Sequence, residues 1–105
     1  RIKQDFERAF TTCDVLVTPT SPTPAWLFGA KADPLQMYLA DIFTVSANVA
    51  GIPGLSMPCG FVERNGKRLP VGLQLMGGWF DEDALFMLGE AYEQATAWHN
   101  EHPTI

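Results

Sequence analysis

Three short apolar runs, each close to a proline or a glycine, limit what this 105-residue chain can fold into. The runs are residues 15–17, 55–62 and 71–76, and prolines lie beside each of them. Proline cannot donate a hydrogen bond to a sheet, so strands that carry it favour sheet edges or end where it begins. Three such strands would leave at least one long unpaired edge, which isolated domains usually avoid. We therefore expect the strands to join a larger sheet, with residues 15–17 as a buried strand.

Apolar residues recur at helical spacing before, between and after these runs. Residues 1–12 carry a first stripe of Ile2, Phe6 and Phe10. Asp33-Pro34 marks a second helix start, because a carboxylate N-cap precedes a proline at the first helical position. That helical segment ends at Gly51, and the β-branched pair at 44–45 leaves open whether it is one helix or two.

A last helix is expected from near Asp81, where three carboxylates complement the positive helix end, to Pro103. Its stripe is Leu85, Leu88, Tyr92, Ala95 and His99. Asn65-Gly66 predicts a hairpin turn before the third strand. The order helix, strand, helix, strand, hairpin strand, helix predicts an α/β fold of three short strands and three to four helices.

The connection after the first strand combines threonines and prolines with a bulky apolar group at 26–28. Because Trp26, Leu27 and Phe28 would need burial, we expect a packed loop. The net charge of −5 and the lack of a cation cluster argue against a nucleic-acid face, and Arg64 to Arg68 is better explained as a solvated turn.

The chain shows no targeting segment and no apolar run long enough to cross a bilayer. Cys13 and Cys59 lack metal-binding spacing and are expected to be free, buried thiols, which indicates a cytoplasmic protein. The chain opens directly on a helical stripe without an initiator Met, so we expect a preceding segment.

No residue of the chain has the context of a catalytic nucleophile. The serines lie outside any Gly-x-Ser-x-Gly motif, and Ser56 is expected to be an ordinary strand serine. His99 and His102 could share a helix face, but no third ligand is near, so a metal site is not expected.

Asp41 is the only charged residue between Pro34 and Val62. A lone carboxylate in so apolar a stretch lies either on a solvent-exposed stripe or in a pocket where it meets a cation. Burial without a partner would cost several kcal/mol or force protonation. The residues alone leave both possibilities open, and a ligand ammonium or an arginine from elsewhere could serve as the cation.

Two motifs stand out in the second half of the chain, Asn-x-Ala-Gly-x-Pro at 48–53 and Pro-x-Gly-Leu-Gln at 70–74. With these motifs, residues 14–20, 33–38, 41–54, 58–60, 70–77 and 92–96 resemble the C-terminal third of amidase-signature enzymes, many of which share both motifs. Within that family the sequence is most similar to the A subunit of aspartyl/glutamyl-tRNA(Asn/Gln) amidotransferase. One departure is Ser46, where many A subunits carry proline.

This resemblance implies the C-terminal part of an amidase-signature fold, a mixed sheet flanked by helices, with residues 1–105 as a single partial domain. It implies a Ser–cis-Ser–Lys catalytic apparatus upstream, so this chain alone is expected to be inactive. Asp41 is implied to bind the α-amino group of substrate glutamine. The implied partners are a B subunit, which uses ATP and Mg²⁺ to amidate mischarged tRNA, and a small C subunit. This chain is expected to act on the mischarged tRNA through the complex and not to contact it directly.

Two other hypotheses remain open at this stage. The chain could belong to a general amidase acting on other amides, which would have no need for a carboxylate at position 41. It could also be a structural or assembly module without a catalytic role. We further expect the isolated chain to self-associate through its unpaired strands.

Overall fold

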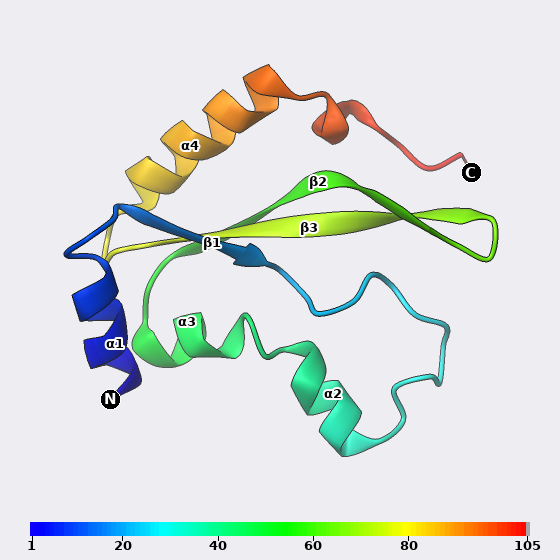
Figure 1. The fold of residues 1–105 in the computed structure, drawn as a ribbon, viewed down its shortest axis with the longest axis horizontal. Helices are drawn as coiled ribbons and strands as arrows, with labels where there is room; N and C mark the ends of the chain where they lie inside the picture. The colour runs from blue at the N-terminus through cyan, green and yellow to red at the C-terminus, as the bar shows by residue number, and fades with distance from the viewer. Residues whose placement is uncertain (105) are drawn as a thin grey trace.

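The computed structural model describes residues 1–104 as a sheet with helices on both sides (Figure 1). The elements are α1 (Ile2–Ala9), β1 (Val15–Pro19), α2 (Pro34–Ala40), α3 (Val45–Ala50), β2 (Gly54–Arg64), β3 (Lys67–Gly77) and α4 (Glu82–Ala95), followed by a 3₁₀ turn (Trp98–Asn100). The expected α/β class with three strands is confirmed. In the described part of the chain, no helix has the length and apolar character needed to cross a membrane.

The three strands pair antiparallel in the order β1-β3-β2. β2 and β3 form the expected hairpin, and Asn65 and Gly66 in its turn have φ angles of 52° and 75°. Two successive positive φ angles define the turn type that Asn-Gly favours, because its twist matches that of the strands. β3 lies in the middle, so β1 and β2 are both edge strands within residues 1–104.

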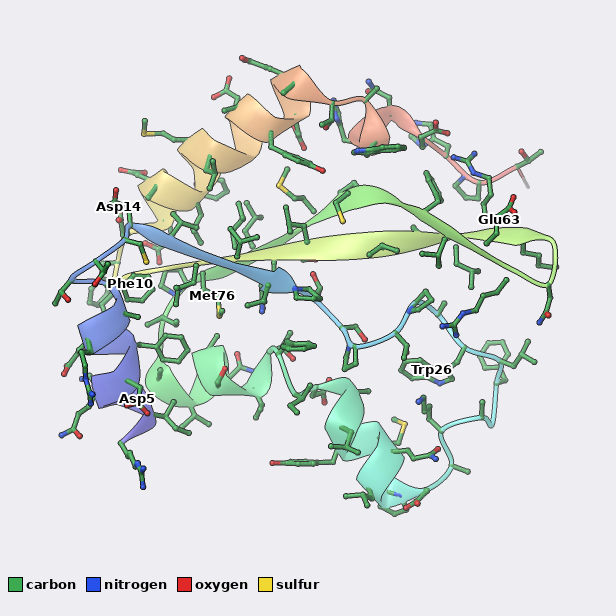
Figure 2. All side chains as sticks on the ribbon, in the orientation of Figure 1. Asp5, Phe10, Asp14, Trp26, Glu63 and Met76 are labelled. Carbon is green, nitrogen blue, oxygen red and sulfur yellow. The ribbon has the colours of Figure 1, made fainter. Side chains whose placement is uncertain are left out.

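The sheet buries one face against α4 and the other against α1 and α3 (Figure 1). On the α4 side the buried residues are Met57, Leu75 and Leu85. On the other side they are Ala47, Ala50, Ile52 and Met76, with Phe6 and Phe10 packed against them. Figure 2 shows Phe10 and Met76 at this second core, where α1 meets the sheet. The fold therefore has two thin cores separated by the sheet.

Large apolar side chains remain uncovered over much of the surface. α2 has no buried residue, and its Leu35 and Tyr38 are more than half exposed. The expected packed loop at 26–28 is wrong: Leu27 is 82% exposed and Phe28 fully so, because neither core extends to this segment. The Cα radius of gyration of 15.5 Å exceeds the roughly 13 Å of a compact domain of this length.

The bounds of two helices and the burial of one strand also differ from expectation. α4 ends at Ala95 and does not continue to His99, because Thr96 is extended and its hydroxyl donates to the Tyr92 carbonyl at 2.9 Å. α1 is shorter than residues 1–12. β1 is an edge strand with Val17 56% exposed, so it is not the buried strand expected. The segment from 34 to 50 forms two helices, α2 and α3, separated by a turn at 41–44.

Candidate functional site

One face of the sheet carries a row of polar residues, one from each strand. Thr18 on β1 and Ser56 on β2 both lie directly opposite Gln74 on β3. Directly opposite residues in antiparallel strands point to the same face. Two residues along, this face carries Leu16 and Met76, which belong to the core under α1 and α3. The polar row therefore begins where that apolar core ends.

Gln74 is the centre of this row and is only 5% exposed. Its amide nitrogen donates to the Thr18 hydroxyl at 3.0 Å and to the Phe43 carbonyl at 2.7 Å. An amide buried without partners would cost about 1–3 kcal/mol, so both bonds matter to stability. Since Phe43 lies in the turn between α2 and α3, Gln74 joins the sheet to that turn.

A second polar pair lies one step further along the same face. The hydroxyl oxygens of Thr20 and Ser56 are 2.6 Å apart. The two side chains meet over Gly72, where an added Cβ would lie 2.8 Å from the Thr20 hydroxyl and 3.1 Å from that of Ser56. The glycine of the Pro-x-Gly-Leu-Gln motif therefore makes room for this bond, and its glutamine forms the bonds described above.

Thr20 and Ser56 line a groove of about 520 Å³ together with the Thr/Pro loop and the middle of β3. In residues 1–104 the only hydrogen-bond partner of the Ser56 hydroxyl is the Thr20 hydroxyl. A nucleophilic serine needs a base within hydrogen-bond reach. Ser56 has none within residues 1–104.

Asp41 lies at the C-terminal end of α2, at the start of the turn. Its carbonyl accepts the Val45 amide at 3.0 Å and the Thr44 hydroxyl at 3.2 Å, so its backbone is firmly placed. Its side chain is exposed, and no hydrogen bond or ion pair from residues 1–104 reaches the carboxylate. The charge is therefore available to a cation from outside this segment, which leaves both sequence-based possibilities consistent with the structure.

The polar row is linked to the turn that carries Asp41, because Gln74 binds the carbonyl of Phe43, two residues beyond Asp41. The sequence suggested Asp41 as a candidate, which stays a prediction, and did not suggest the row of Thr18, Thr20, Ser56 and Gln74. One signal was present: Gln74 is the single polar side chain in the run 71–76. A polar residue that interrupts a buried strand usually has specific partners.

The two cysteines considered from the sequence take no part in the hydrogen bonds of the polar row. Cys13 and Cys59 are free, as expected, but only partly buried, and their thiols donate to the carbonyls of Ala9 and Val71. Throughout residues 1–104, no three His, Cys, Asp or Glu side chains gather in a way that could hold a metal ion.

Comparison with known proteins agrees with the resemblance seen in the sequence. The Amidase family model matches residues 1–86. The chain is 57% identical to the A subunit of glutamyl-tRNA(Gln) amidotransferase from Cupriavidus metallidurans over 97% of its length, and 58% identical to that from Microcystis aeruginosa over 99%. It spans about a fifth of the length of each relative (20% and 21%).

A solved structure gives the same result for the fold. The crystal structure of the glutamyl-tRNA(Gln) amidotransferase A subunit from Thermotoga maritima superposes with a TM-score of 0.65 and is 42% identical. The match covers 75% of this chain and 17% of that one. Since the family model also matches most of the residues, the chain belongs to the amidase family.

Proposed function

We propose that this chain is the C-terminal part of the glutamine-hydrolysing A subunit of a tRNA amidotransferase, as one partial domain. The observation that carries the proposal is the identity of 57–58% to such A subunits over nearly every residue. Those relatives are named for amidotransfer on glutamyl-tRNA(Gln). The proposed reaction releases ammonia from glutamine for transamidation of Glu-tRNA(Gln) or Asp-tRNA(Asn).

Asp41 is the proposed substrate-binding residue of this segment, with the α-ammonium of glutamine as its partner. A carboxylate and an ammonium form a charge-assisted hydrogen bond, which is roughly twice as strong as a neutral one. The carboxylate at the end of α2 is exposed and has no partner among residues 1–104, which supports this role. An amidase for uncharged substrates has no use for such a group, so this role favours glutamine over other amides.

The remaining steps of the reaction are assigned to the rest of the A subunit and to its partner subunits. The Ser–cis-Ser–Lys catalytic apparatus belongs to a part of the protein outside this segment, and this segment alone would not hydrolyse glutamine. The protein is proposed to act in the cytoplasm. A B subunit receives the ammonia and uses ATP and Mg²⁺ to amidate the mischarged tRNA, and a C subunit completes the complex. The many exposed apolar side chains support extensive contact with further protein.

The exchange Asp41→Asn in the full-length protein, in complex with its partners, tests the proposal. It removes the charge and keeps the shape, so the KM for glutamine should rise by at least about tenfold while the thermal midpoint stays unchanged. Asp33→Asn is the matched control, because asparagine caps a helix as well as aspartate does. Unchanged glutamine kinetics in Asp41→Asn would remove the assignment.

A further inference from the structure

Asp41 lies between two helices that are held very differently. α3, on its C-terminal side, buries Ala47 and Ala50 in the core beneath the sheet. α2, on its N-terminal side, buries no residue. Packing of α2 therefore does not determine where the Asp41 side chain lies, and the position must come from the turn at 41–44 and from α3.

The turn itself is a compact hydrogen-bonded unit. The Asp41 carbonyl accepts from the amides of Thr44 and Val45, both at 3.0 Å. Because these bonds link the start of the turn to the start of α3, fixing one carbonyl within it restricts the whole turn. The Phe43 carbonyl is fixed in this way, by the Gln74 amide at 2.7 Å.

The Gln74 amide is suited to this contact for a chemical reason. Its nitrogen carries two hydrogens, and each has an acceptor, the Thr18 hydroxyl and the Phe43 carbonyl. Rotating the amide by half a turn would place its oxygen against the Phe43 carbonyl, so a single orientation is favoured. A carboxylate is acceptor-only when ionised and could not replace it. At 5% exposure, water does not compete for these bonds.

We propose that Gln74 is a positioning residue for substrate binding, which holds the 41–44 turn so that the Asp41 carboxylate meets the ammonium of glutamine. This inference rests on the proposed function. Gln74 does not touch substrate. It acts through the Phe43 carbonyl, so its loss weakens substrate binding by releasing Asp41 from its position.

The test is a double-mutant cycle in the full-length protein in complex with its partners. Gln74→Met keeps the side-chain length and removes both donors, and Gln94→Met, on exposed α4 surface, is the matched control. Gln74→Met should raise the KM for glutamine on the order of tenfold with a much smaller change in kcat. In the Asp41→Asn background, Gln74→Met should raise the KM for glutamine little further, because the carboxylate through which Gln74 acts is already missing.

The outcomes separate this inference from the proposed function. If Asp41→Asn leaves the KM for glutamine unchanged, the proposed role of Asp41 fails. If Asp41→Asn raises the KM but Gln74→Met does not, or if the two losses in kcat/KM multiply in the double variant, the positioning role is overturned.

A second variant covers the case in which Gln74→Met does not fold. Thr18→Val removes the acceptor that, together with the Phe43 carbonyl, fixes the orientation of the Gln74 amide, and so weakens the hold of Gln74 on the Phe43 carbonyl. It should raise the KM for glutamine roughly threefold with kcat preserved. An unchanged KM in a folded Thr18→Val enzyme would then count against the role of Gln74.

Discussion

The hydroxyl oxygens of Thr20 and Ser56 lie 2.6 Å apart, although the residues are 36 positions apart in the sequence. They come from chain segments on opposite sides of the middle strand β3, and strands two places apart in a sheet are separated by about 10 Å. Two short side chains can span that distance only if the middle strand presents no side chain between them. Gly72 meets this requirement.

Gly72→Ala should therefore destabilise the protein. Its Cβ would lie 2.8 Å from the Thr20 hydroxyl, so the Thr20–Ser56 bond must break or the strands must shift. We expect the free energy of unfolding to fall by about 1–3 kcal/mol, measured by urea denaturation of the full-length protein. Gly78→Ala is the control, because a Cβ there meets nothing within 4 Å. Equal midpoints for the two variants would contradict this account of Gly72.

Leu75→Ala should be among the most destabilising exchanges in the segment. Leu75 is 2% exposed and packs with Met57 and Leu85 between the sheet and α4. Truncation leaves a cavity, and losses of about 2–5 kcal/mol are typical for such sites. Met87→Ala on the outer side of α4, two residues from Leu85 and 73% exposed, should cost less than half as much in the same urea titration. A similar loss at both positions would mean that the α4 face is not the core described here.

The isolated 105-residue chain should self-associate. β1 and β2 each present an outer edge with unpaired backbone groups, and such edges pair with other strands. Sedimentation velocity should show a concentration-dependent increase in size. Val62→Lys, which adds a charge on the β2 edge, should reduce it, whereas Ile2→Lys on α1 should not. A clean monomer at high concentration would show that these edges are protected in another way.

Features set by neighbouring residues could be predicted from the sequence. The Asn65-Gly66 turn needs only two positive φ angles, which these residues adopt readily. The start of α2 at Asp33 depends on a bond to Leu35, two residues away. In both cases the partners are close in the chain, so local chemistry decides the outcome.

Features that depend on distant partners could not be predicted in this way. Exposure of Leu27 and Phe28 depends on whether another layer covers them, which their own sequence does not specify. The Gln74–Phe43 bond joins residues 31 positions apart and requires both the register of β3 and the break between α2 and α3. Asp41 could be suggested as a candidate because its charge is isolated in the sequence, whereas Thr18 and Ser56 are ordinary strand residues until the register places them in one row.

The difference between α2 and α3 has a consequence for local folding. Amide hydrogens of a helix without buried residues exchange through small, frequent openings, whereas those of a helix packed in a core require larger ones. Asp41 lies at the boundary between these two regimes. A ligand held by its carboxylate would slow exchange mainly on the α2 side, so substrate recognition and the ordering of one helix would be the same event.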